Sequence, residues 1–293
     1  MDSFKNRKLT VNDLDIQYSL LGKQIGRVMQ PKASIIYLPG FSCDYLNHEN
    51  FANLLVSYDY YAINAPAHGR SPWFNVEDLT IKQYADLVRD FIFKNNLEKV
   101  VLIGHSSSAA VVALLNMMIP ERLIANILVS PIETSFQMDA TKVKDILIPR
   151  LPEDLDQLLR MQVFNYDIKS FNNPIWQNYK KAKLDFYIQN FDALSLQLDT
   201  LLSNELRSSI ENLYTNITKP TLVVFGDSDG LVRINDVANK MRSLIKDSQI
   251  AIIAMAGHEP ALDNPNNYFS NLMTFIDQIV LDESSNLFSS LKG

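Results

Sequence analysis

The sequence predicts an α/β fold: a doubly wound, mostly parallel sheet with a long helical cap inserted between two of its strands. Up to residue 130, short runs of β-branched and aliphatic residues alternate with stretches in which apolar residues recur at helical spacing. Strands that alternate with helices in this way pair in parallel and are buried on both faces. From residue 132 to residue 218 the buried-strand runs stop, and the alternation resumes at Thr221. One sheet therefore receives strands from both sides of the insertion.

Composition sets the broad class of protein. Of the 293 residues, 47% are hydrophobic and 20% are charged, which suits a globular chain with a large core. A net charge of -6 without a basic cluster argues against a nucleic-acid partner. The single cysteine, Cys43, excludes an internal disulfide, and the N-terminus lacks the apolar stretch of a secretion signal. Because no apolar run reaches the ~20 residues of a membrane span, we expect a cytoplasmic protein.

Local patterns justify the elements before the insertion. Residues 9–21 alternate apolar and polar side chains around Asn12-Asp13, which predicts an antiparallel hairpin at the sheet edge. Residues 80–95 carry apolar side chains three and four apart, the spacing of an amphipathic helix, with Thr80 near its start. The other elements expected in this half are strands at 33–38, 60–64, 100–103 and 124–130, and helices at 50–56 and from 107 to about 120.

The rest of the chain divides into the insertion, the end of the sheet and a tail. Residues 132–218 predict several amphipathic helices whose aromatic residues form a small core of their own, with a few lining a pocket. After them we expect strands at 221–225 and 249–254 and helices at 236–245 and 265–281. The resulting division is a core of residues 1–131 and 219–281, a helical cap of 132–218 and a loose tail of 282–293.

The stretch from Val100 to Ala110 carries the clearest chemical signal. A short apolar strand ends at Gly104 and a helix begins near Ser107, which leaves room only for a very tight turn. Ser106, at the apex, is predicted to have a strained backbone and a hydroxyl exposed at the end of the sheet. Ser106 is therefore a candidate nucleophile, although a plain strand-to-helix turn with a capping serine would look similar.

A serine nucleophile needs a base, and the base needs an acid that orients it. The strand ending at Phe225 is followed by a loop with two carboxylates, Asp227 and Asp229, and the last strand is followed by His258. The carboxyl ends of parallel strands meet at one edge of a sheet, so these groups can converge although they lie far apart in sequence. Either aspartate could instead bond its own turn.

Together these stretches resemble the α/β-hydrolase family over roughly residues 9–281. The run Gly104-His105-Ser106-Ser107-Ser108 is similar to the family's G-x-S-x-G nucleophile elbow, with serine in place of the second glycine. The loop Gly226-Asp227-Ser228-Asp229 matches the G-x-x-D of the family's acid, and Gly257-His258 matches its histidine.

This resemblance implies Ser106 as nucleophile, His258 as general base and Asp229 as the orienting acid, with Asp227 as the fallback. It also implies an oxyanion hole formed by the backbone N–H groups of two residues. They are Phe41, after the strand that ends in Pro39-Gly40, and Ser107.

The other three of the four histidines are assigned no catalytic role. His68 lies in a turn similar to the family's structural D-x-P-G-H-G-x-S loop, from which this chain departs at Asn64 and Ala67. We expect His105 to direct its ring away from the reacting face, where it packs or forms hydrogen bonds. We expect His48 to lie on the surface or at a pocket rim.

The resemblance implies a serine hydrolase that cleaves a small, largely apolar carboxylic ester. An aminopeptidase, a C–C bond hydrolase or a thioesterase would use the same three side chains, whereas serine at the apex disfavours relatives with an aspartate nucleophile. The departures at Ser108, Pro39, Asn64 and Ala67 leave open a non-catalytic ligand-binding protein. Without paired cysteines, a metal motif or a dinucleotide fingerprint, no metal and no cofactor is expected.

Overall fold

The computed structural model describes residue 10 and residues 31–133 and 140–290. In this part of the chain, six strands form one parallel sheet in the order β2-β1-β3-β4-β5-β6. The strands are β1 Ser34–Leu38, β2 Asp59–Ala62, β3 Val100–His105, β4 Leu123–Val129, β5 Thr221–Gly226 and β6 Gln249–Ile253. The predicted parallel sheet is confirmed, and the hairpin expected at 9–21 falls almost entirely outside the described residues.

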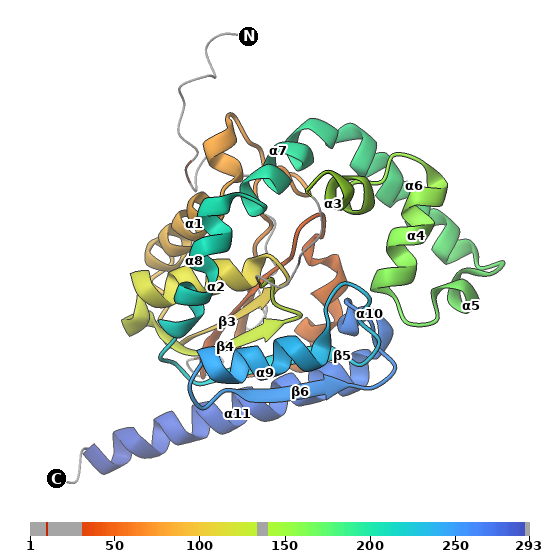
Figure 1. Cartoon of the computed structure of the whole chain (residues 1–293). Helices are drawn as coiled ribbons and strands as arrows, with labels where there is room; N and C mark the ends of the chain where they lie inside the picture. The colour runs from red at the N-terminus through yellow and green to blue at the C-terminus, as the bar shows by residue number, and fades with distance from the viewer. Residues whose placement is uncertain (1–9, 11–30, 134–139, 291–293) are drawn as a thin grey trace.

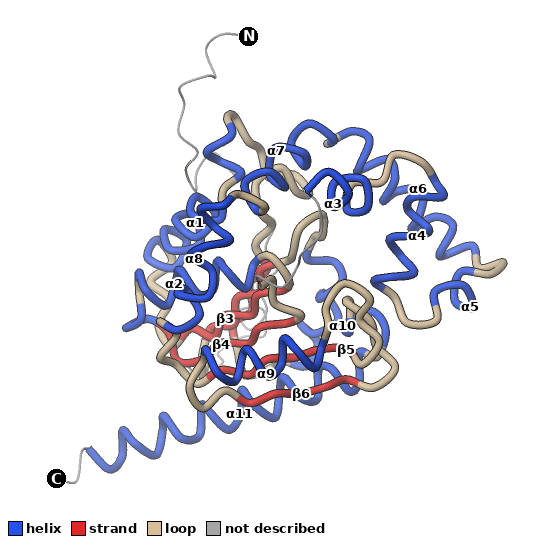
Figure 2. The backbone as a smooth tube through the Cα atoms, viewed as in Figure 1, coloured by secondary structure: helices blue, strands red, loops and turns tan. Residues whose placement is uncertain are grey.

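Helices cover both faces of the sheet, as Figure 2 shows. One face packs against α1 (Ile81–Lys94), α2 (Ser108–Met118), α8 (Asn204–Thr215) and α9 (Ile234–Leu244). The other face packs against the 3₁₀ helix η1 (Tyr45–Leu54) and α11 (Pro265–Ser290). The first five strands are buried throughout because helices lie on both sides of them. Shorter helices are η2 Val76–Leu79, η3 Pro120–Arg122 and α10 Pro260–Asp263.

The segment between β4 and β5, called the insertion below, is helical as predicted. Its helices are α3 Ala140–Leu147, α4 Pro152–Gln162, α5 Tyr166–Ser170, α6 Pro174–Gln189, α7 Phe191–Leu201 and α8. Residues of α3, α4, α6 and α7 bury a separate apolar cluster that includes Val143, Leu158, Tyr187 and Leu198. Figure 1 shows α4, α5 and α6 standing out to one side, whereas α8 lies beside α2. The division into core and cap at 132 and 218 stays a prediction.

Two helices differ from expectation. The helix expected at 50–56 is η1, and it begins at Tyr45 because the Asp44 carboxylate caps it by accepting from the Leu46 N–H at 2.8 Å. Residues 282–290 continue α11 instead of forming a loose tail, because no proline or glycine interrupts the helix after Pro265. Within the described ranges, neither α11 nor any other helix is long and apolar enough to cross a membrane.

Candidate active site

The tight turn predicted at Ser106 is present. β3 ends at His105 and α2 begins at Ser108, so two residues connect the strand to the helix. Ser106 has φ 52°, in the left-handed region, which costs a residue with a Cβ atom roughly 1–2 kcal/mol. A Cβ atom at Gly104 would lie 2.6 Å from the carbonyl oxygen of Ser108, so this position requires glycine. The turn presents the half-buried Ser106 to a cavity at the end of the sheet.

Ser108, which stands where the family has its second glycine, ties this turn to the loop after β1. Its hydroxyl donates to the carbonyl oxygen of Pro39 at 2.5 Å, and both residues are buried. A buried carbonyl left without a partner costs about 1–3 kcal/mol. The departure from the family pattern is therefore compensated by a hydrogen bond that holds the loop next to Phe41.

His258 and Asp229 form a buried pair. The Nδ1 atom of His258 lies 2.8 Å from Oδ2 of Asp229, and the other carboxylate oxygen accepts from the N–H groups of Leu231 and Val232 at 2.8 and 3.1 Å. Burial would raise the pKa of Asp229, but the charge of His258 and these hydrogen bonds hold it below its ordinary value. The carboxylate is thus fixed and ionised beside the imidazole.

Asp227, the alternative acid, lies elsewhere. Its carboxylate accepts hydrogen bonds from the N–H groups of Met255 and Ala256 at 3.0 and 3.3 Å and from the Ser228 hydroxyl at 2.8 Å. It joins the loop after β5 to the loop after β6. Of the two aspartates, only Asp229 contacts His258.

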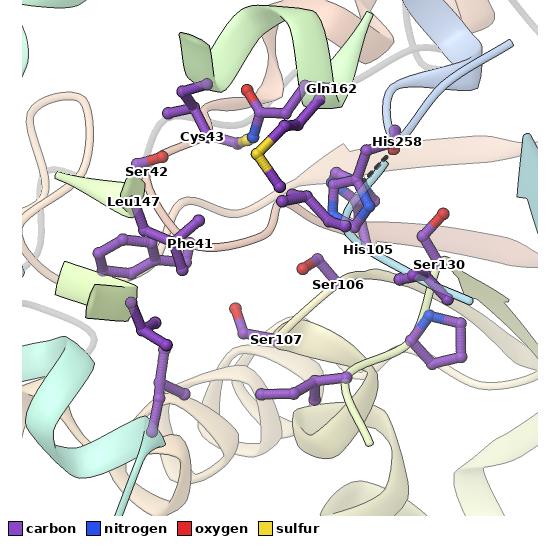
Figure 3. Close-up of a pocket in the computed structure, with 18 of the residues that line it drawn as sticks. Phe41, Ser42, Cys43, His105, Ser106, Ser107, Ser130, Leu147, Gln162 and His258 are labelled. Atoms are coloured by element: carbon purple, nitrogen blue, oxygen red, sulfur yellow. Dashed lines mark hydrogen bonds between the residues drawn. The ribbon is translucent and has the colours of Figure 1, made fainter. Parts of the chain in front are cut away.

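The Asp229 contact also shifts the pKa of His258. Burial would lower the pKa of His258, but the negative charge of Asp229 and its hydrogen bond raise it above 6.5. With Nδ1–H donated to Asp229, Nε2 of the neutral ring is left to accept a proton. His258 lines the same cavity as Ser106, and Figure 3 shows the serine below its ring.

His105 does not turn away from this site. Its ring lies 5.0 Å from that of His258, measured between ring centroids, and its Nε2–H donates to the His258 carbonyl oxygen at 2.9 Å (Figure 3). The prediction that its ring points away from the reacting face was therefore wrong, because the strand end lies directly against the loop after β6. The expected hydrogen-bonding role of His105 is present.

The two predicted oxyanion donors also lie at the cavity. Phe41 and Ser107 both line it, and within the described part of the chain neither backbone N–H donates to a protein acceptor. The next residue after Phe41, Ser42, has a left-handed backbone with φ 57°, and its N–H donates to Nε2 of His68 at 2.9 Å. The loop is therefore held while the Phe41 N–H stays available, as an oxyanion hole requires.

The two remaining histidines are buried. His68 has the structural role expected of it, because its ring links the Ser42 N–H to the carbonyl of Pro66. His48 is 1% exposed, so its predicted place on the surface or at a pocket rim was wrong. Its two ring nitrogens bond the hydroxyls of Tyr60 and Tyr268, which provide partners that the local sequence does not reveal.

The cavity above Ser106 has a volume of about 310 Å³ and is mostly apolar on its insertion side. None of the aromatic residues that the structure describes in the insertion lines it, which corrects the expectation that a few would. Several of them pack against one another instead, as Trp176 does against Tyr166 and Tyr179. The insertion side chains facing the cavity include Val143, Leu147, Leu158, Leu198, Leu201 and Leu202.

One polar cluster beside the site was missed by sequence reasoning. The Cys43 sulfur, a ring nitrogen of His105 and a carboxylate oxygen of Glu259 lie within 4.8 Å of one another, and all three residues are buried. The set resembles a metal-binding one, but the Cys43 thiol already donates to Glu259 at 3.1 Å and Lys183 supplies a nearby positive charge. No spacing motif joins these residues in the sequence.

A serine on a strained strand-to-helix turn, with an aspartate-bound histidine after the last strand of a parallel sheet, defines an α/β protein built for hydrolysis. The sequence profile described as "Alpha/beta hydrolase family" matches residues 35–270. The chain therefore belongs to the alpha/beta hydrolase family and is a hydrolase.

Known proteins similar to this chain agree with that assignment. A Mycoplasma pneumoniae protein provisionally named esterase/lipase 2 is 28% identical over 257 residues, which cover 84% of this chain and 90% of that protein. A crystal structure of a provisionally named lipase from Acinetobacter baumannii has a TM-score of 0.80 at 22% identity, covering 94% and 92% of the two chains. The 2-hydroxy-6-oxo-6-phenylhexa-2,4-dienoate hydrolase from Rhodococcus has a TM-score of 0.72 at 14% identity, covering 90% and 99%. The two structural likenesses show the fold alone.

Proposed function

We propose that this chain cleaves a small, largely apolar carboxylic ester through an acyl-enzyme. Ser106 attacks the ester carbonyl while Nε2 of His258 takes its proton, and Asp229 holds the imidazole. The backbone N–H groups of Phe41 and Ser107 stabilise the tetrahedral oxyanion. His258 returns the proton to the leaving alcohol, and a water activated by the same ring then releases the acid.

The observation that carries this proposal is the convergence of three groups on one cavity. Ser106 lines it at the strained turn, His258 lines it with its Nδ1 held 2.8 Å from Asp229, and aliphatic side chains of the insertion form the facing wall. An apolar wall favours an apolar acyl or alcohol group. The esterase and lipase names of the relatives support an ester as the substrate.

The cavity favours an ester over an N-terminal peptide. An aminopeptidase needs a carboxylate that receives the substrate's ammonium group. Glu133 lines the cavity, but its carboxylate is paired with Lys240 at 3.3 Å and its side chain is 6% exposed. Thioesters and C–C bonds differ from esters mainly in the leaving group, so an acyl thioester and a β-diketone added to the ester panel test these two alternatives. A cytoplasmic location remains a prediction.

Labelling with a fluorophosphonate probe tests the proposal directly. Mass spectrometry of the modified peptide should place the adduct on Ser106, and the wild-type chain should hydrolyse p-nitrophenyl esters of short acyl chains. Ser106→Ala should remove both labelling and turnover while circular dichroism stays unchanged. Absence of an adduct on the folded wild-type chain, together with binding of an ester without turnover, would favour the non-catalytic alternative.

A further inference from the structure

A buried carboxylate that the proposed mechanism does not use lies next to His258. Glu259 is 6% exposed, and its Oε1 accepts a hydrogen bond from the Cys43 thiol at 3.1 Å. Cys43 comes from the loop after β1, 216 residues earlier in the chain. A carboxylate buried to this degree is retained only where other groups compensate its charge.

Lys183 of α6, in the insertion, contributes a smaller part of this compensation. Its ammonium group donates to the carbonyl oxygen of Ser42 at 3.4 Å and lies 5.9 and 5.6 Å from the ring centres of Tyr179 and Tyr187. Burial would raise the pKa of Glu259, but His105, His258, the Cys43 thiol and Lys183 together hold it below its ordinary value. The carboxylate is therefore ionised in the folded protein.

His105 lies between this charge and the base. A nitrogen of its ring lies within 4.8 Å of both the Glu259 carboxylate and the Cys43 sulfur. The centroid of the same ring lies 5.0 Å from that of the His258 ring, with the two planes tilted by 49°, and its Nε2–H donates to the His258 carbonyl oxygen at 2.9 Å. His258 is thus held at its side chain by Asp229 and at its main chain by His105.

We propose that Glu259 is a positioning residue for His258: its hydrogen bond from Cys43 ties the loop after β6 to the loop after β1, and its carboxylate supplies a second negative charge beside the imidazole. The Cys43 thiol holds the carboxylate in place by its hydrogen bond, and Lys183 adds a positive charge nearby. The inference rests on the proposed function only in treating His258 as the general base. During acyl transfer His258 becomes an imidazolium, which two carboxylates stabilise better than one.

Ionisable side chains from several elements of the core and the insertion surround His258 and Glu259. Those that face His258 are Asp229, Glu259 and His105. Those that face Glu259 are Cys43, His105, His258, Lys183, Tyr37, Tyr179, Tyr187 and Tyr268. Among these groups the carboxylate of Glu259 can be neutralised with almost no change in shape, by substitution with glutamine.

The test measures His258 itself, by NMR titration of the full chain labelled with ¹⁵N-histidine. The chain has four histidines, so the His258 signal is assigned by its loss in His258→Asn. Glu259→Gln should lower the His258 midpoint by about 0.5–1 pH unit, as removal of a nearby opposite charge does. Glu259→Asp keeps the charge and should stay closer to wild type. Asp86→Asn removes the same charge from α1, where Asp86 pairs with Lys82 and Arg89, and should leave the midpoint unchanged.

The proposal is overturned if Glu259→Gln titrates like the wild type, or if Glu259→Asp shifts His258 as far as Glu259→Gln does. The midpoint of the acidic limb of kcat/KM should move downward with the NMR value. Since the titration needs no turnover, an NMR shift in a chain that cleaves no ester would retain this inference and refute the proposed function. Turnover without an NMR shift would retain the proposed function and refute this inference.

Discussion

Restoring the family's glycine at position 108 should damage this protein. Ser108→Gly removes the hydroxyl that donates to Pro39 at 2.5 Å and leaves a buried carbonyl oxygen without its partner. That loss costs about 1–3 kcal/mol, and the added backbone freedom of glycine costs a further ~0.5–1 kcal/mol. The sum is about 1.5–4 kcal/mol. With an unfolding entropy of roughly 2.1 cal/mol/K per residue, the 293-residue chain should lose about 2–6 °C in Tm.

Calorimetry and ester turnover measure the two consequences separately. Ser108→Ala keeps the Cβ atom, so it should lose only the part of the stability that comes from the hydrogen bond to Pro39. Ser208→Gly, at an exposed position of α8, reports the cost of glycine in a helix where no buried hydrogen bond is lost. Because the loop next to Pro39 carries Phe41, kcat should also fall, by less than the roughly 10²–10³-fold lost with a whole oxyanion donor. If Ser108→Gly has the same Tm and the same kcat as the wild type, the hydroxyl contributes nothing and the compensation argument is wrong.

Three further outcomes follow from the site. Asp229→Asn should lower kcat by about 10³–10⁴-fold, whereas Asp227→Asn should lower Tm with little change in kcat, since it bonds only the loops after β5 and β6. The acidic limb of kcat/KM should have its midpoint above 6.5, because the pKa of His258 is raised. The free energy of unfolding gained from the protonated His258 ring is fully present below pH 6.5 and is lost as the pH rises through the folded-state pKa. Leu158→Trp should fill the cavity and shift preference within a p-nitrophenyl ester series toward shorter acyl chains, and an unchanged preference would place the acyl group elsewhere.

The sheet and the turn at Ser106 could be predicted because their signals are local. Runs such as Val100–Ile103 are short, β-branched and apolar, and the turn needs only Gly104 and its small neighbours. The choice of Asp229 over Asp227 is different: both stand in one turn, and the preference rested on the family resemblance. The contact with His258 appears only once β5 and β6 are paired in register.

The missed features depend on contacts between distant segments. His48 has no local sign of burial, because the tyrosine hydroxyls that satisfy its ring come from β2 and α11. Cys43, His105 and Glu259 come from three separate strand ends, and no periodicity links them. The continuation of α11 through 282–290 depends on the absence of a helix breaker, which a polar, serine-containing stretch makes easy to misread as a tail.

The same contacts bear on what the insertion does. The carbonyl of Met161, near the end of α4, accepts from Gly230 N–H at 2.9 Å, next to Asp229. A Cβ atom at Gly257 would lie 2.3 Å from the carbonyl oxygen of Gln162, so the chain before His258 is packed against the same helix end. Lys183 of α6 binds the Ser42 carbonyl in the loop that carries Phe41. The acid, base and oxyanion loops are therefore each braced by the insertion. A segment that only covered the cavity would not need these contacts, so we infer that the insertion supports the geometry of the site as well as forming one wall of its cavity.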